Sequence, residues 1–245
     1  MPIEVFNRYE HKYILDHSTY VAVCSALSEH MELDKHNRNG SLYEISNIYY
    51  DTEDSFLIRN SISKPVHKQK LRLRSYGVPG IDDKVFLELK KKHDGLVNKR
   101  RTVLRLNEAY EFIKTGQVCE YKEYMNEQVI REISYFLSVY DVKPMLFLAY
   151  DRIAFFDIND HDLRISFDMN IRSRRDELFL EAGHHGTPVV DDEIYVMEIK
   201  TSRAKPLWLC DILSEHEIRR RSFSKYGTEY INYISGRHAP FIAGV

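Results

Sequence analysis

The chain has 245 residues, a length that fits one large β-rich domain or two small domains, and its 43% of hydrophobic residues excludes an intrinsically disordered protein. Its net charge of −2 excludes an overall positive field that would attract nucleic acid or anionic lipid, so any basic site must be local. The three cysteines, Cys24, Cys119 and Cys210, form no C-x-x-C pair, which excludes a zinc knuckle and a disulfide framework and indicates a reducing compartment. The 17 tyrosines and 12 phenylalanines against 10 glycines favour strands, and we expect one globular domain over residues 1–245.

The chain also lacks the signals that direct a protein into a membrane. Residues 1–8 have neither the basic start nor the apolar run of a signal peptide, and no stretch approaches the roughly 18 apolar residues that span a bilayer. We therefore expect a cytoplasmic protein with no direct membrane insertion.

Sequence periodicity predicts strands and helices along the whole chain. Residues 4–15 place charged side chains at every second position, as in a strand, and residues 20–31 carry apolar residues at helical spacing after the capping residues Asp16 and Ser18. Further strands are expected at residues 41–51, 68–75, 84–90, 96–106, 144–156, 163–169 and 194–200. Further helices are expected at residues 52–59, 108–114, 122–139 and 207–213, with a short helix near the C-terminus. This order indicates an α+β protein of antiparallel strands.

The predicted strands share an unusual charged face. Lys70, Arg72 and Arg74 alternate with Leu71 and Leu73, and the other strands repeat this design. Over the chain, twelve cations fall on such faces: Arg8, Lys12, Lys70, Arg72, Arg74, Lys90, Lys99, Arg101, Arg152, Arg164, Lys200 and Lys225. Four carboxylates accompany them: Glu10, Glu88, Asp168 and Glu198. Eight excess positive charges are thus gathered on one surface of a chain whose total charge is negative.

A surface of this kind suits a phosphate chain. If the strands close into a barrel with helices packed outside, the charged faces line a cationic tunnel. Crowded like charges are costly to desolvate without an anion, and arginine and lysine bind phosphate oxygens well. Glu10 and Glu198 would hold a divalent cation such as Mg²⁺ or Mn²⁺, which takes carboxylate oxygens and bridges phosphates.

The same residues resemble a known family. The segments that carry the resemblance are Arg8-Tyr9-Glu10-His11-Lys12-Tyr13, Lys70-Leu71-Arg72-Leu73-Arg74-Ser75-Tyr76-Gly77, Phe86-Leu87-Glu88-Leu89-Lys90, Lys99-Arg100-Arg101, Tyr150-Asp151-Arg152, Leu163-Arg164-Ile165-Ser166-Phe167-Asp168, Met197-Glu198-Ile199-Lys200 and Ser222-Phe223-Ser224-Lys225-Tyr226-Gly227. Together, in this order, they are similar to the catalytic domain of the vacuolar transporter chaperone (VTC) complex, the polyphosphate polymerase branch of the triphosphate tunnel metalloenzyme (CYTH-like) superfamily. The resemblance covers nearly the whole chain.

The resemblance implies an eight-stranded antiparallel tunnel and a polymerase that moves the γ-phosphate of ATP onto a polyphosphate chain with Mn²⁺ or a similar ion. By motif match, the phosphate-binding residues are Lys12, Arg72, Arg74, Lys90, Lys99, Arg152, Arg164 and Lys225, and the charged-face pattern adds Lys200. Glu198 would bind the metal, with Glu10 as a second carboxylate. The first strand departs from the Glu-x-Glu-x-Lys of hydrolytic tunnel enzymes, which favours the polymerase branch, and the regulatory and membrane-spanning parts of the eukaryotic complex are not in this sequence.

Simpler interpretations of individual residues remain at this stage. Charges on any one strand could face solvent, Trp208 is best explained by packing, and the 11 histidines are scattered without metal-binding spacing. Nucleic acid is not expected, because Lys91 and Arg100 lie on the opposite strand face from their basic neighbours. No G-x-x-x-x-G-K-[ST] loop is present, so phosphate binding would depend on side chains.

Three functions remain open from the sequence: an ATP-dependent polyphosphate polymerase, a metal-dependent triphosphatase acting on triphosphate or a nucleoside triphosphate, and a non-catalytic polyphosphate-binding module. All three share ATP, triphosphate or polyphosphate as the partner. The sequence does not specify the acceptor, the preferred metal, the oligomeric state or the destination of a product.

Overall fold

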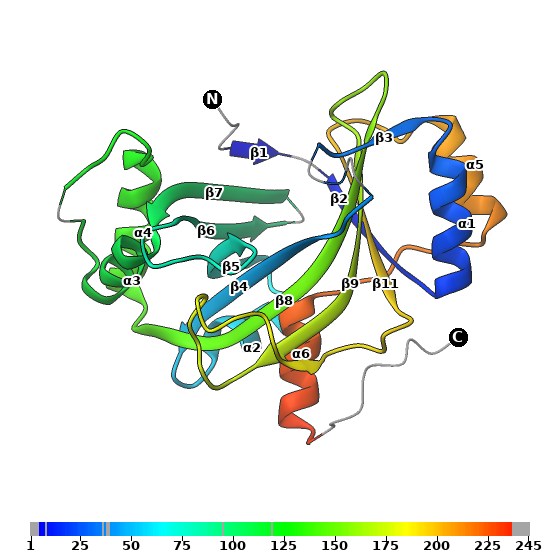
Figure 1. Cartoon of the computed structure of the whole chain (residues 1–245). Helices are drawn as coiled ribbons and strands as arrows, with labels where there is room; N and C mark the ends of the chain where they lie inside the picture. Colours follow the sequence, from blue (N-terminus) through cyan, green and yellow to red (C-terminus); the bar gives the residue numbers. More distant parts are fainter. Residues whose placement is uncertain are drawn as a thin grey trace. The chain divides into compact units, whose positions relative to one another are not determined.

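The computed structural model describes residues 5–7, 9–35, 37, 40–94, 96–118 and 120–236 of the chain (Figure 1). The helices in this part are α1 (His17–Leu27), α2 (Phe56–Ile62), α3 (Leu106–Thr115), α4 (Glu127–Val139), α5 (Leu207–Glu215) and α6 (Lys225–Ile234). The strands are β1 (Val5–Asn7), β2 (Tyr9–Leu15), β3 (Met31–Leu33), β4 (Tyr43–Thr52), β5 (His67–Tyr76), β6 (Lys84–His93), β7 (Leu96–Arg105), β8 (Val142–Asp157), β9 (Arg164–Arg174), β10 (Thr187–Pro188) and β11 (Tyr195–Thr201). The predicted α+β class with antiparallel strands is confirmed.

The chain divides into two compact units. Unit 1 comprises residues 1–7, 45–149 and 173–187, and unit 2 comprises residues 8–44, 150–172 and 188–245. Strand β8 runs through both, since its first half belongs to unit 1 and its second half to unit 2. Arg8 and Cys119 lie outside the described residues. The single domain over residues 1–245 stays a prediction.

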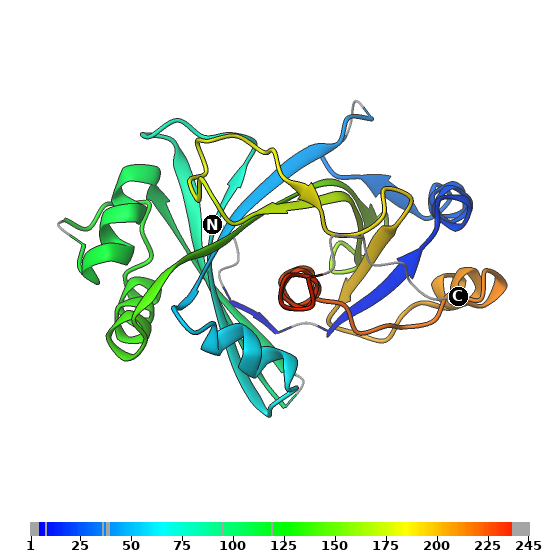
Figure 2. The ribbon, with the colours of Figure 1, turned by 90° about the horizontal axis from the view of Figure 1, so that it is seen from below.

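Unit 1 contains the strand order β1-β7-β6-β5-β4-β8, with antiparallel pairing from β1 through β4. The strands alternate as predicted, because Leu71, Leu73, Leu87 and Leu89 are fully buried while their neighbours in sequence lie on the other face. Helices α3 and α4 cover the apolar face, as both views show (Figure 2). The opposite face is therefore left to the charged side chains.

Unit 2 contains the order β8-β9-β11-β2, and β3 pairs with β8. Strand β11 lies between β9 and β2 and is antiparallel to both. The apolar core of unit 2 includes Phe167, Met197 and Ile199 from the strands, with Leu27 from α1 and Leu209 from α5. Packing on one side of the strands again leaves the other face free for charge.

Helix boundaries differ from the periodicity. The helix predicted at residues 20–31 begins earlier, at His17, because the Asp16 carboxylate accepts the Thr19 N–H at 2.7 Å, and it ends at Leu27. Met31 instead starts β3, where it pairs with Asp157. Helix α4 begins at Glu127 rather than residue 122, where the Asn126 side chain accepts the Val129 N–H at 3.0 Å.

Helix α2 also begins later than the sequence predicts: it spans Phe56–Ile62 and not residues 52–59. The buried Asp51 carboxylate, at the end of β4, accepts the N–H groups of Leu57 at 2.8 Å and Ile58 at 2.9 Å. This cap comes from several residues upstream, so local periodicity does not reveal it. In the part of the chain that is described, no helix is both long enough and apolar enough to cross a bilayer.

Candidate functional site

Two rows of side chains cross the strands of unit 2. In one row, Glu198 of β11 lies directly opposite Lys12 of β2 and Ser166 of β9. In the next row, Lys200 lies opposite Glu10 of β2 and Arg164 of β9. Side chains directly opposite one another in an antiparallel pair share a face. The strand register therefore brings together five of the residues that the sequence predicted for phosphate or metal binding.

Glu198 is the centre of this cluster and is only 5% exposed. Its carboxylate lies 3.1 Å from the Lys12 ammonium, 3.0 Å from that of Lys200, and 3.6 Å from both Arg152 and Lys225. Burial alone would raise the pKa of Glu198, but the four cations outweigh it and hold the pKa well below its usual range. Glu198 is thus a buried anion in a cationic surface.

A second buried carboxylate, Asp168 of β9, orients two more cations. The Arg152 guanidinium donates to both Asp168 oxygens, at 2.5 and 2.7 Å, and the Lys225 ammonium at the start of α6 also donates to Asp168. The Tyr150 ring lies beneath both cations, 5.2 Å from the Arg152 guanidinium and 4.5 Å from the Lys225 nitrogen. These contacts fix two long side chains before any substrate binds.

Arg164 is held by two residues from distant parts of the chain. Its guanidinium donates to the Asp34 carboxylate at 3.1 Å and to the Tyr43 hydroxyl at 3.0 Å. Lys200, its neighbour across the strands, has a lowered pKa because burial and the nearby Arg152 and Arg164 charges outweigh the attraction of Glu198. Burial and these two neighbouring charges thus oppose protonation of Lys200, and an added anion would favour it.

The predicted metal residues Glu198 and Glu10 lie on either side of Lys12. The Lys12 ammonium is 3.1 Å from Glu198 and 3.5 Å from Glu10. Within the described residues, no group of three or more histidine, cysteine or acidic side chains is arranged to hold a metal ion. Mg²⁺ commonly uses one or two protein carboxylates together with substrate phosphates, so this pair fits a metal that the substrate helps to hold.

Unit 1 repeats the arrangement around Glu88 of β6. In one row across β4 to β7, Glu88 lies opposite Arg72 and Arg101, and Tyr49 lies beyond Arg72. The fully buried carboxylate is 2.6 Å from Arg72, 2.7 Å from Lys99 and 2.5 Å from Arg101. Against the effect of burial, these cations hold the pKa of Glu88 well below its usual range.

The remaining predicted cations of unit 1 surround this centre. The Arg74 guanidinium lies 3.9 Å from Glu88 and donates to the Asn47 side chain at 2.9 Å. Lys90 lies opposite Lys99 in the next row. Burial and the neighbouring arginines lower the pKa of Lys99 well below its usual range despite the attraction of Glu88. An added anion beside Lys99 would favour its protonated form.

Each unit therefore gathers its share of the predicted site residues on one strand face, except that Lys225 reaches the cluster of unit 2 from the start of helix α6 and not from a strand as predicted. The cluster in unit 1 contains Arg72, Arg74, Lys90 and Lys99. The cluster in unit 2 contains Lys12, Arg152, Arg164, Lys200, Lys225, Glu10 and Glu198. The roles assigned to these residues stay predictions, whereas their grouping within each unit is a feature of the structure.

Sequence reasoning gave no role to several contacts that shape the clusters. Asp168 was predicted on the charged face, but its role in orienting Arg152 and Lys225 was not. Tyr150 precedes Arg152 by two residues and was within reach of a parity argument. Asp34 and Tyr43 contact Arg164 from segments more than 100 residues away, and no local pattern indicates this.

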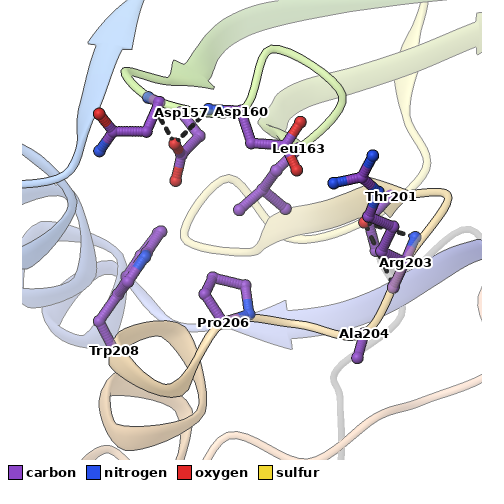
Figure 3. Close-up of a pocket in the computed structure, with 9 residues that line it drawn as sticks. Asp157, Asp160, Leu163, Thr201, Arg203, Ala204, Pro206 and Trp208 are labelled. Atoms are coloured by element: carbon purple, nitrogen blue, oxygen red, sulfur yellow. Dashed lines mark hydrogen bonds between the residues drawn. The ribbon is translucent and has the colours of Figure 1, made fainter.

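A separate pocket of about 250 Å³ lies in unit 2 (Figure 3). Asp157 and Asp160 lie on one side of it, with Pro206 and Trp208 of the α5 region facing them. The Asp157 carboxylate is already occupied by the N–H groups of Asn159 and Asp160, each at 2.8 Å. None of the predicted site residues lines this pocket, so we assign it no part in phosphate binding.

Comparison with known proteins gives a family match and distant relatives. The family model described as the VTC domain matches residues 7–233. Vacuolar transporter chaperone complex subunit 4 of Trypanosoma cruzi is 26% identical over 235 residues, and that of Trypanosoma brucei brucei is 27% identical over 236 residues. Each alignment covers 81% of this chain but 29% of the relative, so the chain spans less than a third of the length of these proteins.

Solved structures share the fold. A candidate adenylate cyclase of Bacillus halodurans has a TM-score of 0.56 and 16% identity, covering 91% of this chain and 96% of its own. A candidate adenylyl cyclase of Hippeastrum, in which triphosphatase activity is dominant, has a TM-score of 0.55 and 16% identity, covering 98% of each chain. Together with the family match, these likenesses show the fold of the triphosphate tunnel superfamily, as the sequence resemblance implied.

Proposed function

The chain belongs to the VTC domain family, and on that premise we propose that it is a metal-dependent phosphotransferase that makes polyphosphate from the γ-phosphate of ATP. The observation that carries the proposal is the cluster around Glu198 in unit 2. There, four cations lie within 3.6 Å of one buried carboxylate. The curated relatives are subunits of a vacuolar transporter chaperone complex, which is consistent with the proposal.

Phosphoryl transfer needs positioned charge more than it needs a nucleophilic side chain. In the reaction, the bond between the γ-phosphorus and the bridging oxygen of ATP breaks, a terminal oxygen of the acceptor chain bonds to that phosphorus, and ADP leaves. The negative charge is spread over phosphate oxygens throughout, so fixed cations lower the barrier by electrostatic stabilisation. Arg152 and Lys225 are suited to this task because Asp168 and the Tyr150 ring already fix their orientation.

Glu198 and Glu10 are the residues that would hold a divalent ion, and the bound ion would neutralise charge on bridging phosphate oxygens. The lowered pKa of Glu198 keeps it ionised and able to coordinate at neutral pH. Lys12 lies between the two carboxylates and could transfer its contacts to phosphate oxygens when the ion binds. Mn²⁺ and Mg²⁺ both suit such oxygen ligands.

The Glu88 cluster of unit 1 contributes further phosphate-binding groups under the same proposal. Arg72 and Arg101 present guanidinium groups on the charged strand face. Arg72 donates to Glu88 through Nε and to the Tyr49 hydroxyl through Nη1, and Arg101 contacts Glu88 through both Nε and Nη2. These contacts orient two guanidinium groups, the side-chain type that best matches phosphate oxygens. Lys99 is buried with a depressed pKa, and an added phosphate would favour its protonated form.

The proposal is tested by incubating the purified chain with ATP and Mn²⁺ and separating the products by gel electrophoresis. Long chains that a polyphosphate-specific exophosphatase degrades are the expected result. The Glu198→Gln variant is expected to make none, while Glu215→Gln on the exposed end of α5 serves as a matched control. Absence of any chain with the wild-type protein, with or without an added polyphosphate primer, would contradict the proposal.

A triphosphatase is the second candidate, because the Hippeastrum protein that shares the fold has a dominant triphosphatase activity. A water molecule would then replace the acceptor phosphate in the attacking position, and the same residues would bind the substrate. Orthophosphate released without chains would support this candidate. Tight binding of tripolyphosphate without turnover would instead support a non-catalytic binding module. A cytoplasmic location stays part of the proposal.

A further inference from the structure

The charged face of unit 1 continues past Glu88 as two further rows of cations. Lys70 of β5 lies opposite Lys90 of β6, which in turn lies opposite Lys99 of β7. One row further along the strands, Lys68 lies opposite Lys92. We call these five residues the lysine rows. They share the face of Arg72 and Glu88, because strand positions two residues apart point to the same side.

Carboxylates are scarce on this part of the face. Glu88 is in contact with Lys99, but among the described residues neither Lys68 nor Lys92 forms an ion pair with a carboxylate. Lys68 is half-buried and its ammonium donates to the Ser61 carbonyl at 3.2 Å. Burial lowers its pKa, and the charges of Lys92, Lys64 and Lys90 lower it further. The fold thus keeps the charges of Lys68 and Lys92 close together despite their mutual repulsion.

Like charges directly opposite each other in a sheet are destabilising, and such pairs are normally separated or neutralised. In unit 1, by contrast, lysines lie directly across from one another in two consecutive rows. Lys91, between Lys90 and Lys92, shows the ordinary alternative: its side chain lies on the other face and pairs with Glu132 of α4 at 3.3 Å. The contrast between Lys91 and Lys92, neighbours on one strand, points to an external anion as the partner of Lys68 and Lys92.

The spacing of the rows indicates what kind of anion fits. Rows on one strand face recur every second residue, about 7 Å apart, so the rows of Arg72, Lys70 and Lys68 span roughly 14 Å. A single orthophosphate reaches one row, whereas a linear chain of phosphates can contact all three. On β5, β6 and β7, the described positions of these rows hold seven cations and one carboxylate: Lys68, Lys70, Arg72, Lys90, Lys92, Lys99 and Arg101, with Glu88.

We propose that the lysine rows form a chain-binding subsite for long polyphosphate. In this subsite, Lys68 and Lys92 bind phosphates further along the chain than the phosphates bound by Arg72, Lys99 and Arg101, the cations that contact Glu88. This inference rests on the proposed function for the identity of the ligand, and it adds the residues that distinguish a long chain from tripolyphosphate. Lys68 and Lys92 bind the chain and take no part in the transfer step. Their effect falls on affinity for long chains.

The test is a binding measurement that needs no turnover. The dissociation constants of long-chain polyphosphate and of tripolyphosphate are measured by isothermal titration calorimetry for the wild type and for Lys68→Gln/Lys92→Gln. Loss of two half-buried charges worth about 0.7 kcal/mol each weakens long-chain binding about ten-fold. The dissociation constant of tripolyphosphate is expected to stay within two-fold of the wild-type value, a limit that corresponds to roughly the free energy of one weak surface contact.

The matched control is Lys91→Gln/Lys143→Gln, which removes two lysine charges of unit 1 that pair with Glu132 and Glu53 instead. Lys68→Arg/Lys92→Arg retains the charges and is expected to bind long chains as the wild type does. Thermal unfolding of each variant confirms folding. If the glutamine variant proves unfolded, single Lys92→Gln gives the same test with a smaller expected loss, about three-fold.

The outcomes separate this inference from the proposed function. Unchanged long-chain affinity in Lys68→Gln/Lys92→Gln overturns the subsite even if the wild type makes polyphosphate. An equal loss for tripolyphosphate also overturns it, because the lysines would then belong to the triphosphate site. An equal loss for a single-stranded RNA of similar charge shows a general polyanion surface and overturns the assignment to phosphate chains. A selective loss supports the subsite even if the wild type only hydrolyses triphosphate.

Discussion

Replacing Glu198 by glutamine removes one buried negative charge and leaves its shape nearly unchanged. Four cations then lose the carboxylate that lies within 3.6 Å of each. Removing one partner of a buried ion pair costs about 3–5 kcal/mol, and the lower limit applies here because Asp168 and Glu10 still contact three of the cations. For a chain of this size, about 3 kcal/mol lowers the melting temperature by roughly 6–12 °C.

A phosphate ligand should reverse this loss, because it supplies the missing negative charge. At a concentration about 100 times the wild type's dissociation constant, tripolyphosphate stabilises the wild type by about 2.7 kcal/mol, and at that same concentration the stabilisation of Glu198→Gln should be larger. Turnover of ATP with Mn²⁺ should fall at least about 100-fold, since Glu198 would hold the divalent ion that neutralises charge at the reacting phosphates. Tripolyphosphate binding and catalysis thus move in opposite directions.

Differential scanning fluorimetry with and without tripolyphosphate measures the first two effects, and release of ADP measures the third. Glu215→Gln is the control for a lost glutamate charge on an exposed helix end. If Glu198→Gln melts like the wild type, gains no extra stability from tripolyphosphate and turns over ATP normally, then the cations do not depend on this carboxylate. The cluster would then have no place in the proposed chemistry.

Three further predictions follow from the same clusters. Replacing Arg72 and Arg74 together by glutamine should weaken tripolyphosphate binding about 100-fold, at about 1.4 kcal/mol per charge-assisted contact, and titration calorimetry measures it with exposed Arg59→Gln as the control. Acid should destabilise the protein through Glu88 and Glu198, whose pKa values are depressed in the folded state. Such a carboxylate stabilises the fold above its ordinary pKa of 4.5 and loses that contribution as the pH falls through the folded pKa. Unfolding by urea between pH 7 and pH 2 should show the loss of stability only below pH 4.5, and constant stability throughout would refute the prediction. Removing divalent ions with EDTA should abolish ADP release but leave tripolyphosphate binding by the wild type detectable by calorimetry, and turnover that persists in EDTA would contradict the metal assignment.

The strands and their charged faces could be predicted from the sequence because a period of two residues is a local property. Lys70, Arg72 and Arg74 alternate with buried leucines in the structure as they do in the sequence. Helix boundaries were less accessible, since α2 begins where the Asp51 carboxylate caps it from the end of β4. A distant cap of this kind depends on the chain path and leaves no local pattern.

The members of each cluster could be predicted, but not the way the acidic residues organise them. Glu88 contacts Arg72, sixteen residues before it, and Arg101, thirteen residues after it, through the register of two strand pairs. Sequence reasoning counted Glu88 only as an exception among the positive charges. Strand register, which decides which side chains lie opposite, is not encoded by the parity of any single strand.

The two units solve one physical problem in the same way. A strand face rich in cations would repel itself and would lack fixed geometry, so each unit places a nearly or fully buried carboxylate at its centre: Glu88 in unit 1 and Glu198 in unit 2. The carboxylate orients the cations before a ligand arrives, and cations that are already oriented need little reorganisation when phosphate charge appears. Burial, together with the charges of neighbouring arginines, depresses the pKa of Lys99 in one unit and of Lys200 in the other, although each lies beside the carboxylate. Negative charge from a phosphate would favour the protonated form of both lysines, which agrees with the phosphate-binding role that we propose for the two faces.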